Sequence, residues 1–421
     1  MKKKFLIAAT ILAALVVLLI TALFVLRGKS PLVSDDDLQF TRAVISSNEN
    51  AFFILEEAQK EIFWPEDKSG ELKEILNWKS WDNDFVHQII QENKKTLELF
   101  DKAQLCPQLQ IPPIEDFVED YTYLVSWKST GQIALLRAMA LFREGKENAA
   151  VDETFKILRF GHQIEGCDGT VIHYLVGVAI KSAALRNLQH MIGNGFPPCT
   201  SARSHLNELS QFHANQPGLT NVFKTEYRVQ KKMVDDMAVG KMPGVTNSNA
   251  QSITRITRSP VFNPGKTQDI FAQVARAQID GISRPYSEMQ SGPVSRPTKK
   301  SPVKLLLSGN AVGEVLTQML LPAQEKFMAK KCQENVTVAA TQVLVALKCF
   351  KEKHGSLPSS LEELAPEFLP NLPMDDFDGK QLRYSVEKKI IYSIGPDLVD
   401  SDGEEKDAQK KTLDIPFKIE F

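Results

Sequence analysis

The sequence predicts a mainly α-helical protein that ends in a small α+β domain and begins with a single membrane-spanning helix. Three observations lead to this fold class: a long uncharged N-terminal segment, apolar residues at helical spacing through the middle, and two β-rich runs near the end. At 421 residues the chain is long enough for two or three domains. The expected divisions are 1–30 (basic stub and anchor), 31–235 (helical domain), 236–301 (connector) and 302–421 (α+β domain).

The N-terminal segment has the length and composition of a transmembrane helix. Residues 5–26 contain no charged side chain, and 22 helical residues span about 33 Å, enough for a hydrocarbon core of roughly 30 Å. Lys2, Lys3 and Lys4 precede this segment and Arg27 and Lys29 follow it, a modest bias that favours an N-terminus inside the cell. Because the segment is longer than the core of a signal peptide and lacks a good cleavage site, we expect an uncleaved anchor. A cleaved signal peptide is the alternative.

Residues 31–235 have the pattern of successive helices. The clearest part is 130–161, where two apolar faces are separated by a break at Glu144-Gly145-Lys146. Two helices joined by a short glycine turn form an antiparallel hairpin. This hairpin resembles a single tetratricopeptide-type unit, although the sequence has no repeat with a period of about 34 residues. Further helices are expected over 171–192 and 202–212.

The connector is strongly basic. Residues 224–304 hold 14 Lys or Arg against 6 Asp or Glu, a local net charge of +8. Gly, Pro, Ser and Asn predict loops, interrupted by a short helix over about 267–282. A long loop around the helical domain is one interpretation; contact with anionic lipid or an acidic partner is the other. Gly265-Lys266-Thr267 is not expected to bind nucleotide, because Pro260 stands where a phosphate-binding loop needs glycine.

A long helix is expected at the start of the C-terminal domain. The helical pattern runs from Gly313 to Lys353, and Pro322 predicts a kink or a fresh start within it. His354-Gly355 is typical of a helix end, with glycine in the left-handed conformation. Ser360 and Glu363 have the spacing of a capping box, which predicts a second, short helix.

The end of the chain has the pattern of a small antiparallel sheet. Residues 382–386 and 389–394 are rich in β-forming side chains and flank a turn at Glu387-Lys388, which is typical of a hairpin. Residues 414–417 predict a last edge strand. Between these strands lies an acidic loop that begins at Gly395.

A series of short motifs follows the long helix in a fixed order. They are Phe350-Lys-Glu-Lys-His354-Gly355, Leu357-Pro358, Leu361-Glu-Glu-Leu364, Pro373, Asp375-Asp376-Phe377, Gly379, Tyr384, Tyr392-Ser-Ile-Gly395 and Asp397. In this order, the motifs resemble the globular half of the type II secretion major (G-type) pseudopilin. The resemblance covers roughly the last fifth of the chain and implies a pilin-like fold.

The resemblance also implies a calcium site, because the C-terminal loop of that family binds calcium. Asp397 matches the first acidic ligand, since it follows Tyr-Ser-Ile-Gly-Pro. Asp400, Asp402 and Asp407 fall in the loop that supplies the other ligands. Calcium prefers the carboxylate and carbonyl oxygens that such a loop can present. A solvated acidic turn is the alternative.

Composition and motifs favour some classes of protein and argue against others. A net charge of −2 argues against a nucleic-acid-binding protein. The five cysteines form no CxxC pair, so a zinc ribbon is not expected; disulfides outside the cytosol are compatible, but the sequence does not pair them. HExxH, GxSxG and Walker motifs are absent. His162 and His173 lie near Glu165 in the sequence, but an apolar helix makes a core histidine the simpler interpretation of His173.

We therefore expect a membrane-anchored extracytoplasmic interaction or scaffold protein with no catalytic residues. It would lie on the inner membrane of a bacterium, contact the bilayer through residues 5–26, bind a protein partner and bind no nucleic acid. A component of a type II secretion or pilus-like assembly, with a calcium-stabilised C-terminal loop, is the alternative. An enzyme whose site leaves no sequence motif is a third reading.

Overall fold

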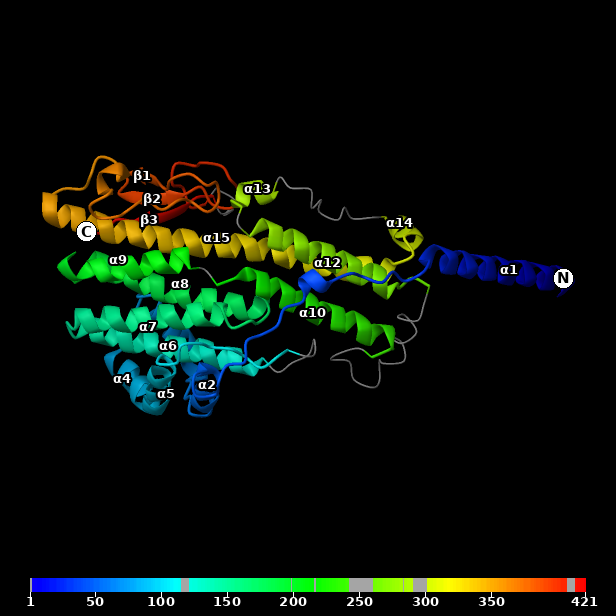
Figure 1. Ribbon diagram of the computed structural model, residues 1–421, viewed down its shortest axis with the longest axis horizontal. Helices are drawn as coiled ribbons and strands as arrows, with labels where there is room; N and C mark the ends of the chain where they lie inside the picture. Colours follow the sequence, from blue (N-terminus) through cyan, green and yellow to red (C-terminus); the bar gives the residue numbers. More distant parts are fainter. Residues whose placement is uncertain are drawn as a thin grey trace.

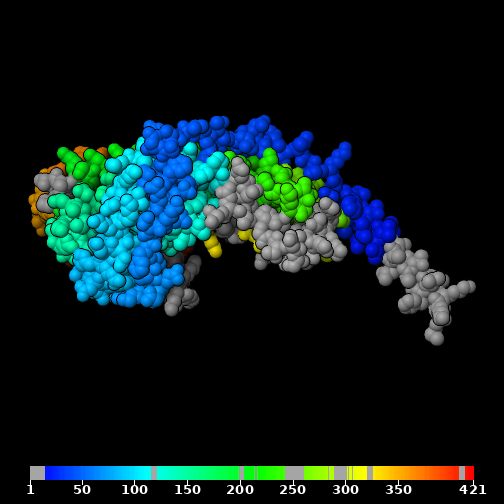
Figure 2. All heavy atoms as spheres, turned by 90° about the horizontal axis from the view of Figure 1, so that it is seen from below, coloured from blue at the N-terminus to red at the C-terminus, as the bar shows by residue number. Residues whose placement is uncertain are grey.

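The computed structural model describes residues 2–114, 121–197, 199–215, 217–241, 260–282, 284–290, 301–406 and 413–421. The molecule is elongated, with its long helices roughly along the long axis and a small sheet near one end (Figure 1). Helices and a three-stranded antiparallel sheet confirm the predicted mainly helical fold class. Helix α1 (Lys2–Arg27) extends beyond the body at the opposite end (Figure 2).

Helices make up most of the described chain between α1 and the sheet. Short 3₁₀ segments lie at Asp36–Leu38, Glu66–Lys68 and Leu361–Leu364. The helices are α2 (Ala51–Lys60), α3 (Ser69–Leu76), α4 (Asn83–Glu92), α5 (Lys94–Ala103), α6 (Thr122–Arg143), α7 (Glu147–Glu165), α8 (Val171–Asn194), α9 (Cys199–Ala214), α10 (Leu219–Ala238), α12 (Pro264–Gly281), α13 (Tyr286–Gln290), α14 (Pro302–Leu307) and α15 (Ala311–His354).

Helices α6 and α7 form the predicted hairpin. Helix α6 ends at Arg143, and Gly145 turns the chain with a φ of +74°, which glycine adopts without steric cost. The predicted helix over 171–192 is confirmed as α8. Within the expected connector, α12 begins at Pro264, next to an Asn263 side chain that accepts a hydrogen bond from the amide of Lys266.

Helix α15 runs along the long axis of the molecule. Its 44 residues form one helix about 66 Å long, so the fresh start expected at Pro322 does not occur. It ends as predicted at His354, followed by Gly355 with a φ of +80°. Helices α8 and α9 pack on one side of α15, and the sheet covers the other side (Figure 1). One apolar core therefore includes Leu188 of α8, Val343 of α15 and Ile391 of the sheet.

The sheet has the predicted hairpin and edge strand. Strands β1 (Arg383–Ser385), β2 (Ile390–Ser393) and β3 (Ile415–Lys418) lie in the order β1-β2-β3, and both pairs are antiparallel. All four residues of β2 are buried, because β2 is the central strand and faces α15. The capping box at Ser360 and Glu363 is also present.

A disulfide joins the helical part of the chain to α15. Cys199 at the start of α9 is bonded to Cys349 near the end of α15, across 150 residues of sequence. Cys106, Cys167 and Cys332 are free and buried. Among the side chains that the structure describes, which in α1 begin at residue 15, no helix is long and apolar enough to cross a membrane.

Breaking the disulfide is expected to lower the free energy of unfolding by up to about 5 kcal/mol, because closing so long a loop restricts the unfolded chain. Denaturant unfolding of the wild type with and without reductant measures this change. The Cys199→Ser/Cys349→Ser variant is the control and should not respond to reductant. An unchanged wild-type midpoint after full reduction would contradict the expectation.

Candidate functional site: a polar cavity beside a buried charge cluster

A buried lysine holds three helices together. Lys181 of α8 lies between two carboxylates, with Nζ 3.0 Å from Oε2 of Glu165 in α7 and 2.5 Å from Oε1 of Glu334 in α15. All three side chains are at most 3% exposed. Burial raises the pKa of Glu165 to about 8, and the two carboxylates raise the pKa of Lys181 against the effect of burial.

Two glycines allow this approach of α7 and α8. A Cβ atom on Gly161 would lie 2.8 Å from the carbonyl oxygen of Gly177, and one on Gly177 would lie 2.6 Å from that of Gly161. Both distances are too short for a methyl group. The close crossing brings Lys181 within reach of Glu165, so these glycines position the charge cluster.

A half-open cavity of about 350 Å³ lies beside the charge cluster. It is bounded by the loop before residue 111, the end of α7 and the start of α10. Glu165 lines the cavity and also belongs to the cluster. The polar side chains that line it include Gln110, His162, Gln163, Glu165, Asp168 and Asn221.

Asp168 organises one wall of the cavity. It adopts a φ of +59°, a left-handed conformation that aspartate tolerates better than most residues. Its carboxylate accepts hydrogen bonds from Asn221 (3.0 Å) and Gln110 (3.3 Å), and lies 3.6 Å from Nε of Arg42. Asp168 therefore links Gln110 of the loop, Asn221 of α10 and Arg42.

Three other lining side chains have buried polar atoms without a hydrogen-bond partner in the described part of the chain. These atoms are Nδ1 of His162, Oε1 of Gln163 and Oε1 of Glu165. Burial, aided by the charge of Lys181, lowers the pKa of His162 to about 4, so its ring is neutral at pH 7. The cavity can thus offer hydrogen bonds to water or to a small polar molecule.

The neighbouring groups do not have the properties of activated catalytic residues. Burial raises the pKa of Cys167 to about 12, which keeps its thiol protonated. His173 is 1% exposed; its Nδ1 accepts a hydrogen bond from the amide of Thr170, and its Nε2 lies 2.6 Å from the Tyr123 hydroxyl. It is a satisfied core histidine, as the sequence pattern favoured.

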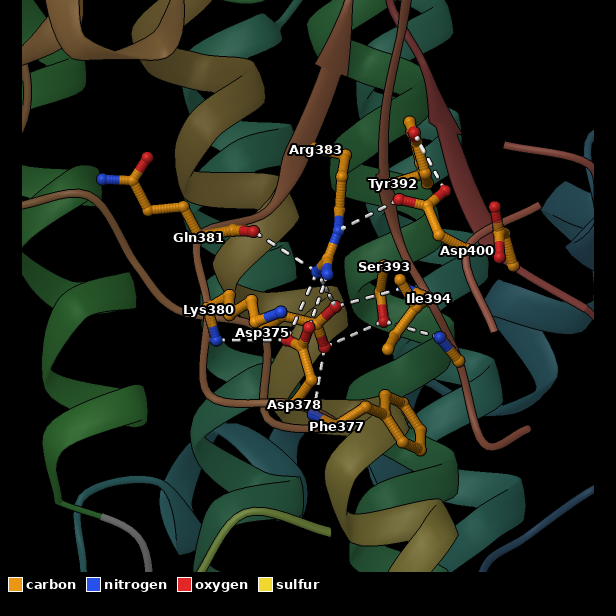
Figure 3. A network of polar contacts seen from close by, with 12 residues as sticks. Asp375, Phe377, Asp378, Lys380, Gln381, Arg383, Tyr392, Ser393, Ile394 and Asp400 are labelled. Atoms are coloured by element: carbon orange, nitrogen blue, oxygen red, sulfur yellow. Dashed lines mark hydrogen bonds and ion pairs between the residues drawn. The ribbon is translucent and has the colours of Figure 1, made fainter. Parts of the chain in front are cut away.

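The described carboxylates of the acidic loop do not converge on one point. Asp402 pairs with Nζ of Lys388 at 2.6 Å, and Asp397 accepts a hydrogen bond from the amide of Val399. Asp400 accepts from the Tyr392 hydroxyl (Figure 3). Asp407 lies outside the described residues. Within the described ranges, no three His, Cys, Asp or Glu side chains are grouped so that they could hold a metal ion.

A network centred on Arg383 ties the acidic loop to the turn before the sheet (Figure 3). The guanidinium lies 3.0 Å from Asp375 and 2.5 Å from Asp378, and its Nε is 3.8 Å from Asp400. Asp375 is fully buried and also accepts a hydrogen bond from the Ser393 hydroxyl; burial raises its pKa. From the sequence, Asp375-Asp376-Phe377 was identified only as a motif of the resemblance, although an arginine inside a β-rich run a few residues after three aspartates was a usable signal.

Comparison with known proteins identifies no relative of this chain. No protein-family profile matches the chain, and neither the curated proteins nor the solved structures contain a match. The pseudopilin and tetratricopeptide resemblances therefore rest on the sequence motifs alone.

Replacing Lys181 by Met is expected to destabilise the fold by about 3–5 kcal/mol, because two buried carboxylates lose their cation. Denaturant unfolding followed by circular dichroism measures this loss. Adding Glu165→Gln and Glu334→Gln should recover part of it, because no buried charge is then left unpaired.

Lys79→Met is the matched control, because the Lys79–Glu74 pair is exposed and such pairs contribute about 1 kcal/mol or less. Equal effects of Lys181→Met and Lys79→Met would contradict the assigned role of the cluster.

Proposed function

We propose that this chain is a membrane-anchored extracytoplasmic scaffold protein, whose helical body carries the pilin-like sheet away from the bilayer. One observation supports this proposal above the others. Leu15, Val16, Val17, Leu18, Leu19 and Ile20 are each at least 45% exposed in α1. Six consecutive residues cover every side of a helix, so this part of α1 is apolar all round without a covering protein surface. Such a helix is stable in a hydrocarbon core.

The disulfide supports a location of the body outside the cytosol. Disulfides persist in oxidising compartments and are rare in the cytosol, where thiols are kept reduced. Cys199 and Cys349 are both on the body and not on α1. Together with the three lysines before the anchor, this bond favours a body outside the cytosol.

The continuous core supports a scaffold. Helix α15 belongs to the same apolar core as the helical part and the sheet, and Lys331 and Asn335 of α15 both hydrogen-bond Asp376 before β1. The sheet is therefore held along a helix about 66 Å long, at the end of the molecule far from α1 (Figure 1). A protein partner recognised at the sheet would be held away from the membrane.

Leu15→Arg with Leu18→Arg is expected to release the protein from membranes, because each arginine near the centre of a span costs about 2.5–3.5 kcal/mol. Alkaline extraction followed by immunoblotting measures the change, and protease access to a C-terminal tag reports the side. Leu105→Arg, at an exposed leucine of the body, is the control and should stay in the membrane fraction. Release of the wild type by alkali would overturn the anchor.

The second candidate function is a component of a secretion or pilus-like assembly with a calcium-stabilised loop. The order of the elements favours it: a long helix, a hairpin, and an acidic loop in which Asp397 directly follows the Gly395-Pro396 turn. The described carboxylates have partners from the protein, so a calcium ion would have to displace Lys388 from Asp402.

Under this second candidate, removing calcium with a chelator should lower the melting temperature, because an ion bound by the folded state alone stabilises it. Thermal unfolding of the full chain with calcium or chelator measures the shift. Asp397→Asn with Asp402→Asn should abolish the calcium response, whereas Asp269→Asn on α12 should not. An identical melting temperature in both buffers would remove the calcium site.

A further inference from the structure

Three segments distant in sequence meet where α1 joins the body, and we call them the collar: residues 26–31, 263–267 and 301–310. The Asn263 side-chain amide donates hydrogen bonds to the carbonyl oxygens of Arg27 (2.8 Å) and Lys29 (3.3 Å). The amide of Gly265 donates to the Ser30 hydroxyl at 2.7 Å. The end of α1 is therefore hydrogen-bonded directly to the start of α12.

Two glycines make the collar tight. A Cβ atom on Gly309, whose φ is +68°, would lie 2.1 Å from the carbonyl oxygen of Leu26. A Cβ atom on Gly265 would lie 2.2 Å from the carbonyl oxygen of Pro31. Both positions exclude any larger residue, so the chain leaving α1 is packed against the body and its direction is fixed.

The collar is cationic. Its charged residues are Arg27, Lys29, Lys266 and Lys304, and its three segments contain no Asp or Glu. Lys29 and Lys304 are exposed, and Nζ of Lys266 lies 3.4 Å from the carbonyl oxygen of Leu26. Four positive charges are thus concentrated where the apolar helix leaves the body.

The collar also exposes apolar side chains. Helix α14 lies next to the end of α1 (Figure 1), and its Val303 and Leu307 are 64% and 56% exposed. Leu32, just after the first collar segment, is fully exposed. Exposed apolar side chains interleaved with lysines are typical of surfaces that lie in the headgroup region of a bilayer.

We propose that the collar is a binding surface for the head groups of acidic phospholipids. Lys29 and Lys304 would contact lipid phosphates, and Val303 and Leu307 would enter the boundary between head groups and acyl chains. This inference rests on the proposed anchoring, because the occupant is the bilayer that α1 enters. Since the end of α1 is packed within the collar, seating the collar on lipid would also orient the body over the membrane.

Tryptophan quenching by brominated acyl chains tests the proposal on the full chain. Leu18→Trp, Leu307→Trp and Val399→Trp variants are reconstituted in vesicles of phosphatidylcholine, with and without phosphatidylglycerol. Val399 is an exposed apolar residue of the acidic loop beside the sheet and serves as the control. The wild type, which has four tryptophans, supplies the background.

The expected result is strong quenching of Leu18→Trp in all vesicles, quenching and a blue shift of Leu307→Trp that increase with phosphatidylglycerol, and neither effect for Val399→Trp. Adding Lys29→Gln and Lys304→Gln to Leu307→Trp should remove the dependence on phosphatidylglycerol. If Leu307→Trp does not fold, Val303→Trp takes its place.

Each part of the proposal fails in a distinguishable way. If Leu18→Trp is quenched but Leu307→Trp, like Val399→Trp, is not, lipid binding by the collar is overturned and the anchor is kept. The collar surface would then be open to a protein. Quenching of Leu307→Trp that ignores phosphatidylglycerol would overturn recognition of acidic head groups. No quenching of Leu18→Trp would overturn the anchor and the collar proposal with it.

Discussion

The ion cluster of Lys181 with Glu165 and Glu334 is the constraint on which the arrangement of the helices depends. A charge this deeply buried is tolerated only when its partners stand at hydrogen-bonding distance. A sliding of α8 past α7 or α15 by one residue would move an ammonium or a carboxylate by about 1.5 Å along the helix and break the match. The cluster therefore selects one register among the many that apolar packing alone would accept.

Around this cluster the molecule is organised by α15. The helix packs against α8 and α9 on one side and against the sheet on the other, so the two parts distinguished in the sequence share one core. The disulfide between Cys199 and Cys349 and the pair of Lys331 with Asp376 reinforce its two interfaces. The helical part and the sheet are consequently expected to unfold as one cooperative unit.

Local signals account for what the sequence predicted well. The turn at Gly145, the helix end at Gly355 and the capping box at Ser360 each depend on a few adjacent residues, so their chemistry can be read from the chain. Of the kink or fresh start predicted at Pro322, the fresh start does not occur, because the helix continues through the proline from Ala311 to His354.

The features missed are those that join distant residues. The Cys199–Cys349 bond, the Lys181 cluster and the cavity bring together side chains from separate elements, and no spacing rule pairs them. One signal was present: Lys181 is a charged residue in the middle of an apolar helix, which calls for a partner. The sequence also placed Asp397, Asp400 and Asp402 in one loop, but only the structure shows Lys388 and Arg383 beside two of them.

The long covalent loop closed by Cys199 and Cys349 has a consequence for how the protein withstands cleavage. Every peptide bond between Cys199 and Cys349, including all of the basic connector, lies inside that loop. A single protease cut anywhere within it would leave two polypeptides still joined through sulfur. The two pieces of a cleaved molecule would therefore stay covalently joined in an oxidising environment. They would separate only if the disulfide were reduced and the shared core unfolded.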